Sequence, residues 1–193
     1  MISRFLLTLT FLSASIVGAA SVHARPEGQP LPASVAKLAG VQCDHKSEGW
    51  SYECTYQGYV ISADDRACDG ADDAMYGDLG LSGNKSHIAL LDKFPQGGST
   101  VAEAADRQFI CVSAKAKRAS PYDVWYYVVA IPVASVKACK NNSNCGAPGD
   151  LPVKLTKQGT GQPCHLTAQK RYAGDCAAGW VNAAEVDLYS MGL

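Results

Sequence analysis

Residues 124–131 read Val-Trp-Tyr-Tyr-Val-Val-Ala-Ile, the most strand-like stretch of a chain of 193 residues. Its β-branched and aromatic side chains favour extended backbone. Neighbouring side chains of a strand point to opposite faces of the sheet, so an uninterrupted apolar run suits a strand that is covered on both faces. We therefore predict a buried strand within 122–133. Pro132 should end it or lie at its edge, because proline has no N–H for a ladder hydrogen bond.

Shorter strands are predicted on both sides of this stretch. Large apolar and polar residues alternate over Trp50–Tyr56, the pattern of a half-buried strand. Similar segments recur with turn residues between them, which is typical of a small barrel or sandwich. The remaining predicted strands cover 59–61, 86–91, 108–113, 151–156 and 179–182.

Two short helices complete the predicted secondary structure. Thr100-Val101-Ala102-Glu103 matches a capping box ahead of an alanine-rich helix. Residues 33–39 form the second helix, with Gly40 as its stop. The fold class is therefore mainly β, a disulfide-stapled small barrel or sandwich with a few short helices.

The N-terminus has the order of a secretory signal peptide. One positive charge, Arg4, precedes an apolar stretch, and small residues precede a cleavage point after Ala24. We considered a membrane anchor instead, but the apolar stretch is shorter than the roughly 20 residues of a membrane span. We expect residues 1–24 to be removed and the mature chain to carry no membrane span. An extended leader at 25–32 then precedes either one domain over 33–193 or two β modules, at 33–147 and 148–193.

Eight cysteines follow the signal, and an even count in an exported chain predicts four disulfides. Two predicted hairpins place cysteines in bridging range, one about a turn at 46–49 and one about a turn near Lys170. A polar loop closes a third pair, and elimination leaves the fourth. The predicted pairs are Cys43–Cys54, Cys164–Cys176, Cys139–Cys145 and Cys68–Cys111.

Charge and spacing argue against several classes of function. Removing residues 1–24 takes away one arginine and no acid, which leaves 16 basic and 18 acidic residues. This balance is unlike the basic domains that bind nucleic acid. No cysteine or histidine spacing matches a zinc site. We predict no metal and no cofactor.

Six aspartates lie within Asp64–Asp78, the most acidic part of the chain. Carboxylate oxygens suit calcium, but the spacing does not match a calcium-binding loop. A solvated acidic loop, a cation site and an acidic patch for a basic partner all remain open. Asp72 and Asp73 are the residues of this segment that we assign to partner binding.

No recognisable catalytic motif is present. His45, His87 and His165 follow the signal, and each could act as a general base. None lies in a nucleophile or metalloprotease motif. Gly159-Thr160-Gly161 lacks the lysine and the helix of a phosphate-binding loop, so we interpret it as a turn. We assign no catalytic residue.

Aromatic residues are the other candidates for recognition, because Trp and Tyr are favoured anchors at interfaces. We assign Trp125, Tyr127 and Trp180 to partner binding. Core packing explains such residues equally well. Adjacent aromatics of 125–127 must point to opposite faces, so at least one lies away from the main core, under another layer or exposed.

Residues from about Leu151 to Tyr189, which include Gly179-Trp180-Val181-Asn182, resemble the last strands of bacterial SH3-type modules. The resemblance covers about a quarter of the mature chain. It implies a five-stranded barrel that binds peptide or cell-wall glycan and has no catalytic activity. It implies no individual binding residue.

The sequence thus favours a periplasmic or secreted binding protein. We expect a protein partner in the envelope or medium, engaged in the manner of an inhibitor or immunity protein. Binding of cell-wall glycan is one alternative, and a hydrolase that uses paired carboxylates of the acidic segment is another.

Overall fold

The computed structural model describes residues 46–48, 51–64, 67–68, 74–80, 86–140, 142, 145 and 150–189. Residues 1–45, which include the predicted signal, leader and first helix, lie outside this set. The strands are β1 (Lys46–Glu48), β2 (Ser51–Tyr56), β3 (Tyr59–Asp64), β4 (Tyr76–Leu79), β5 (Ile88–Leu91), β6 (Thr100–Ala104), β7 (Phe109–Lys117), β8 (Val124–Ala130), β9 (Lys154–Leu155), β10 (His165–Leu166), β11 (Tyr172–Ala173), β12 (Ala178–Asn182) and β13 (Val186–Leu188). Three short 3₁₀ turns accompany them, η1 (Val133–Ser135), η2 (Lys137–Cys139) and η3 (Ala183–Glu185).

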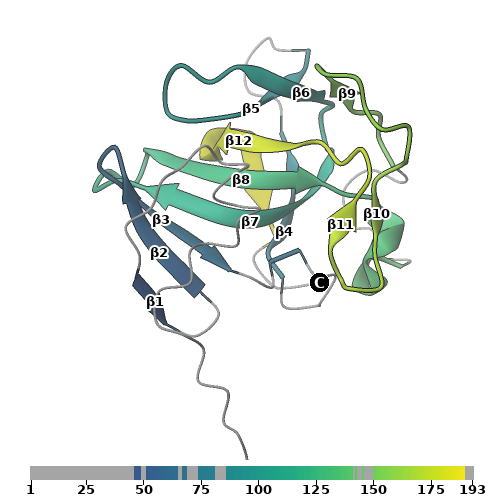
Figure 1. Ribbon diagram of the computed structural model, residues 1–193, viewed down its shortest axis with the longest axis horizontal. Helices are drawn as coiled ribbons and strands as arrows, with labels where there is room; N and C mark the ends of the chain where they lie inside the picture. Colours follow the sequence, from purple (N-terminus) through teal and green to yellow (C-terminus); the bar gives the residue numbers. More distant parts are fainter. Residues whose placement is uncertain are drawn as a thin grey trace, which may run out of the picture.

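One antiparallel sheet of eleven strands contains most of these elements (Figure 1). Its order is β1-β2-β3-β7-β8-β12-β5-β6-β9, while β4 pairs with β7 and β13. β10 and β11 form a separate hairpin. The predicted mainly β, disulfide-stapled fold is confirmed, and it is sandwich-like. The described strands do not close into a barrel.

The predicted central strand is β8, and it is paired along both edges, by β7 and β12. Tyr127 faces a core cluster that also holds Trp180, whereas Tyr126 and Val128 face a second cluster with Leu90. Both faces of β8 are therefore covered, as its composition predicts. The strand ends two residues before Pro132.

A β-bulge at Ser113 changes which face the side chains of β7 occupy. The pairing of β7 with β8 shifts register between Val112 and Ala114. Before the bulge, Ile110 and Val112 belong to the cluster of Leu90. After it, Ala114 belongs to the cluster of Trp180. The extra residue moves the later side chains of β7 into a different core, while Phe109 and Cys111 on the other face of the strand belong to a third cluster.

Trp180 lies at the centre of the first cluster and has no exposed surface. Its ring centroid is 4.1 Å from that of Phe94 and 5.4 Å from that of Tyr127. Gly179 allows β5 to approach β12, because a Cβ there would lie 2.8 Å from the carbonyl oxygen of Leu91. The glycine and the tryptophan together explain how β12 fits between β8 and β5.

Strands from both parts of the chain share the main sheet. β12 lies between β8 and β5, and β13 pairs with β4. β9 pairs with β6. The segments on either side of residue 148 are therefore hydrogen-bonded to one another through three of the later strands.

Two predicted local structures are wrong. Thr100–Ala104 is strand β6 rather than a helix, because pairing with β5 buries Ala102 and Ala104 in the core. Tertiary pairing here overrides the local helix signal. Lys46–Glu48 is strand β1 rather than part of a turn, because it pairs with the start of β2.

Three of the four predicted disulfides are present, Cys68–Cys111, Cys139–Cys145 and Cys164–Cys176. Cys54 is also disulfide-bonded, but its predicted partner Cys43 lies outside the described residues. No described cysteine is a free thiol. Such bridges persist in oxidising compartments, so the structure indicates an extracytoplasmic environment.

Candidate binding groove

An open groove of about 550 Å³ lies where three segments of the chain meet. Gln108 and residues 130–132 come from the ends of the central strands. The segment around β9 contributes Leu151, Val153 and Leu155, and the C-terminal part contributes further residues. The volume falls within the roughly 300–1,000 Å³ of small-ligand pockets. We call this site the Gln108 groove.

Gln108 is the most unusual residue of the groove. Its side chain is 3% exposed. Its amide nitrogen Nε2 donates to the carbonyl oxygen of Phe109 at 3.1 Å, and its oxygen Oε1 has no hydrogen-bond partner. Exchanging the two amide atoms would set Oε1 against the Phe109 oxygen, so the orientation is fixed.

The backbone around Gln108 is held from both sides. Its N–H donates to the carbonyl oxygen of Ala105, and its own carbonyl oxygen accepts from the N–H of Leu79 at 2.9 Å. The side chain therefore has little freedom to seek another partner. A buried acceptor without a donor destabilises a fold by about 1–3 kcal/mol. Oε1 itself is buried, so a molecule in the groove would not reach it without a movement of the side chain.

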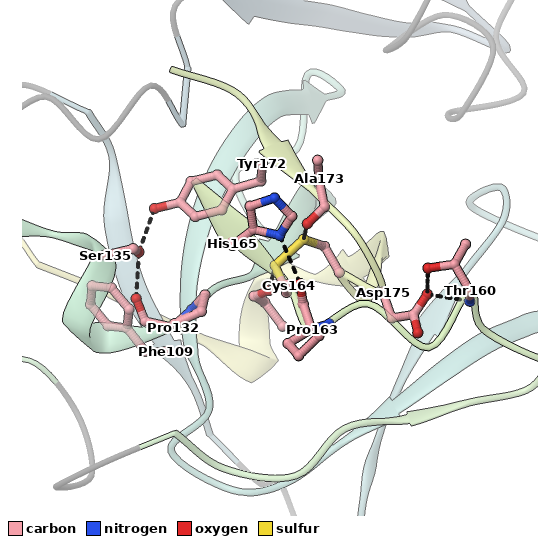
Figure 2. Close-up of a disulfide and its surroundings, with 12 residues drawn as sticks. Phe109, Pro132, Ser135, Thr160, Pro163, Cys164, His165, Tyr172, Ala173 and Asp175 are labelled. Atoms are coloured by element: carbon pink, nitrogen blue, oxygen red, sulfur yellow. Dashed lines mark hydrogen bonds between the residues drawn. A yellow bond between two sulfur atoms is a disulfide. The ribbon is translucent and has the colours of Figure 1, made fainter. Parts of the chain in front are cut away.

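A disulfide-closed hairpin borders the groove beside Pro132 (Figure 2). The bridge Cys164–Cys176 closes the hairpin of β10 and β11 about a turn at Lys170, as predicted. Ser135 Oγ donates to the carbonyl oxygen of Pro132 and accepts from the Tyr172 hydroxyl at 2.7 Å. These bonds fix the hairpin against the end of β8.

Asp175 organises the loop at Gly159-Thr160-Gly161 (Figure 2). Its carboxylate accepts from the Thr160 N–H at 2.6 Å, the Thr160 hydroxyl at 2.8 Å and the Gly161 N–H at 2.8 Å. The bonds to Thr160 hold the pKa of Asp175 below its usual range. A Cβ at Gly159 would lie 2.4 Å from this carboxylate, so a larger residue there would displace the Asp175 side chain. The amides that could hold a phosphate are therefore occupied by the protein's own carboxylate.

A second pocket of about 360 Å³ lies elsewhere on the molecule. Trp125, His87, Asn182 and Glu185 line it together with small apolar side chains. Trp125 is partly buried and packs against the cluster of Trp180, while His87 is exposed. We call this site the Trp125 pocket. It combines an aromatic ring with amide, imidazole and carboxylate groups.

The structure separates the residues predicted to bind a partner. Tyr127 and Trp180 are buried in the first core cluster, so their rings offer no surface to a partner. Trp125 is accessible within its pocket. Asp72 and Asp73 lie outside the described residues. The predicted aromatic surface thus reduces to one tryptophan.

Two of the three candidate histidines, His87 and His165, are among the described residues. His165 is exposed, and its Nδ1 lies 2.8 Å from the carbonyl oxygen of Pro163. His87 lies in the Trp125 pocket. His45 is outside the described residues.

Within the described part of the chain, no cluster of three or more His, Cys, Asp or Glu side chains could hold a metal ion. None of the described helices has the length and apolar character needed to cross a membrane.

The sequence did not reveal the importance of Gln108. It begins the predicted strand 108–113 and reads as an ordinary polar residue before an apolar run. Its surroundings come from segments about 20 to 70 residues further along the chain. A single polar residue ahead of Phe-Ile-Cys-Val was the only available signal.

Comparisons with protein-family models, with curated proteins and with solved structures find no match to this chain. The resemblance of 151–189 to SH3-type modules stays a prediction. The function must therefore be argued from the groove.

Proposed function

We propose that this chain is an exported binding protein that engages a protein partner through the Gln108 groove. Residues 1–24 support export through their signal-peptide pattern. The disulfides support an oxidising location, for which we propose the periplasm or, as an alternative, the medium. An inhibitor or immunity protein would act in this way.

The observation that carries this proposal is the open groove of about 550 Å³, where three segments of the chain meet. Its lining includes the exposed polar side chains of Lys157 and Gln158, which can bond to the main chain of a protein segment. The partly exposed side chains of Leu151, Val153 and Leu155 would contact the same segment.

The construction of the groove favours binding by a surface that is already formed. Cys164–Cys176 closes one border, and the Ser135–Tyr172 contact fastens that border to Pro132. Asp150 accepts from the N–H of Val133 at 2.9 Å and holds the segment leading to β9. A rigid site loses less conformational entropy on association.

Binding of cell-wall glycan is the second candidate, and the Trp125 pocket favours it. A tryptophan ring can stack on the apolar face of a sugar, while Asn182, His87 and Glu185 can bond its hydroxyl groups. This candidate uses a different site from the first. The two functions can therefore be separated by mutation.

The test is an affinity capture with the oxidised mature chain as bait, read by mass spectrometry against envelope and secreted extracts. Parallel baits carry Leu151→Glu, which places a charge in the groove, Trp125→Ala, and Gln96→Glu as a matched change at an exposed loop position. A stoichiometric protein that is lost with Leu151→Glu alone supports the proposal. Retention of every captured protein by Leu151→Glu contradicts it. Co-sedimentation with wall material that depends on Trp125 would support the glycan candidate instead.

A further inference from the structure

The hairpin between β7 and β8 carries the most exposed large apolar side chain among the described residues. Tyr122 is 92% exposed, and Met75, the other described side chain of this kind, is 46% exposed. A single exposed side chain is common on protein surfaces and indicates nothing by itself. Tyr122 differs because several contacts fix the backbone beneath it. We call residues 117–123 the Tyr122 hairpin.

The tip of this hairpin is a tight turn. The Asp123 N–H donates to the carbonyl oxygen of Ser120 at 3.3 Å, which closes four residues into a turn. Pro121 follows Ser120 at the turn position that favours proline, and its ring fixes the backbone there. The Ser120 hydroxyl also accepts from the Tyr122 N–H at 3.4 Å. Tyr122 is therefore presented on a backbone with little freedom.

Arg118 fastens the hairpin to the turn between β2 and β3, which lies at the same end of the sheet (Figure 1). Its guanidinium donates to the carbonyl oxygen of Gln57 at 2.6 Å and lies 4.4 Å from the centre of the Tyr59 ring. The Tyr59 hydroxyl donates to the Asp123 carboxylate at 2.6 Å. Because Tyr59 is buried, these contacts tie the tip of the hairpin to the core.

The hairpin and the end of β7 are basic, although the mature chain carries more acidic than basic residues. Residues 115–123 contain three basic residues, Lys115, Lys117 and Arg118, and one acid, Asp123. Asp123 already accepts from Tyr59 and lies 3.8 Å from Arg118. Lys117 is exposed, and 45% of the Arg118 side chain is exposed. A protein surface that meets this hairpin should therefore be acidic.

We infer that the Tyr122 hairpin inserts into a concave, acidic cleft of a folded protein partner, with the Tyr122 ring as its anchor. Trp, Tyr and Arg most often dominate the binding energy of interfaces, where they fill pockets of the partner. A tip that is rigid before binding loses little conformational entropy. The hairpin precedes Val124 at one end of β8, whereas the Gln108 groove includes Ala130 at the other end. The hairpin is therefore a second binding surface, and its use does not depend on the groove.

The hairpin suits a protein cleft better than a membrane surface. Membrane binding strengthens with the apolar area that enters the lipid. Tyr122 is the one large apolar side chain exposed on the hairpin, and its neighbours Ala119, Ser120 and Pro121 are small. One ring in a fixed position suits a pocket of matching shape.

The first experiment places a photoreactive benzophenone derivative of phenylalanine at position 122 of the oxidised mature chain. This bait is irradiated in envelope and secreted extracts, and the cross-linked peptides are identified by mass spectrometry. The same group at position 96, in an exposed loop, is the control. We expect position 122 alone to cross-link to one protein, at a cleft lined by Asp or Glu side chains. Cross-links to a flat or basic surface, or none at all, would overturn the inference.

The cross-linked protein is then purified and titrated against variants of the unlabelled chain. We expect Tyr122→Ala to weaken binding about thirtyfold or more, and Tyr122→Phe to weaken it about tenfold at most. Lys117→Gln should lower the association rate and its dependence on salt. Because Tyr122 is exposed, Tyr122→Ala should leave the melting temperature nearly unchanged, which separates a loss of binding from a loss of folding.

The other outcomes overturn specific parts of the inference. An unchanged affinity of Tyr122→Ala would remove the anchor. An affinity that neither salt nor Lys117→Gln alters would overturn the acidic cleft. A loss with Leu151→Glu but not with Tyr122→Ala would assign the partner to the Gln108 groove and overturn the second surface. Binding to phosphatidylglycerol vesicles that Tyr122→Ala abolishes would assign the hairpin to a lipid surface and overturn the protein partner.

Discussion

Asp187 lies directly opposite Asp78 where β13 pairs with β4. Burial raises the pKa of Asp78, and the facing Asp187 carboxylate raises it further. The Arg107 guanidinium acts in the opposite direction and lowers this pKa. Like charges directly opposite one another destabilise a pair of strands.

We predict that Asp187→Asn stabilises the protein at neutral pH. The raised pKa of Asp78 means that the folded state loses stability as the pH rises through the unfolded value, about 3.9, towards the folded one. Removing the opposing charge should add a few tenths of a kcal/mol at pH 7, a modest gain because the pair is partly exposed. Thermal melts at pH 7 and near pH 3 check this. The gain should vanish at the lower pH, and Glu53→Gln, an exposed carboxylate-to-amide change, should not reproduce it.

Gln108→Met should leave stability unchanged or raise the free energy of unfolding by up to about 1 kcal/mol, because an unpaired buried acceptor is removed. The hydrogen bond to Phe109 is also lost, but that carbonyl oxygen still accepts from the Ile131 N–H at 3.2 Å. Urea unfolding of the oxidised proteins measures the change. Gln96→Met, at an exposed position, is the control. A loss of more than about 2 kcal/mol would show that Oε1 has a donor in solution.

Trp180→Ala should destabilise the protein by about 3–5 kcal/mol, because a fully buried tryptophan leaves a cavity. The contacts with Phe94 and Tyr127 would be lost together. Thermal unfolding and near-ultraviolet circular dichroism report both effects. Trp125→Ala, at a partly buried position, should lower the melting temperature much less. Equal losses for the two variants would contradict the assignment of Trp180 to the core.

The Cys68–Cys111 bridge should contribute more to stability than Cys139–Cys145. The first joins residues 43 apart and the second residues 6 apart. Loop-closure entropy then gives about 4 and about 2 kcal/mol respectively. Paired alanine variants of each bridge, compared by urea unfolding, measure the difference. A larger loss from the shorter loop would show that contacts other than chain entropy dominate.

Much of the fold could be predicted from the sequence because its signals are local. The apolar run of β8 and the hairpin of Cys164 and Cys176 depend on neighbouring residues alone. Thr100–Ala104 was misassigned because a capping-box pattern says nothing about the strand that pairs with it. Alanine supports either state, and β5 decides between them.

The groove could not be predicted in the same way. Gln108, Leu155 and Pro163 are far apart in the sequence and meet only after the sheet has formed. Whether Gln108 Oε1 meets a hydrogen-bond donor depends on all the residues packed around it, so no single stretch of sequence reveals it. Aromatic residues are easier to recognise in the sequence as candidates for partner binding. Of the three predicted ones, however, Tyr127 and Trp180 lie in the core.

The bulge at Ser113 has a consequence for how this chain can vary over time. On either side of it, the residues of β7 pack into different interiors, Ile110 with one and Ala114 with the other. A substitution at Ile110 or Val112 therefore calls for compensating changes around Leu90, and one at Ala114 or Ala116 for changes around Trp180. The two halves of one strand can drift independently, provided that no deletion removes the single residue that separates them.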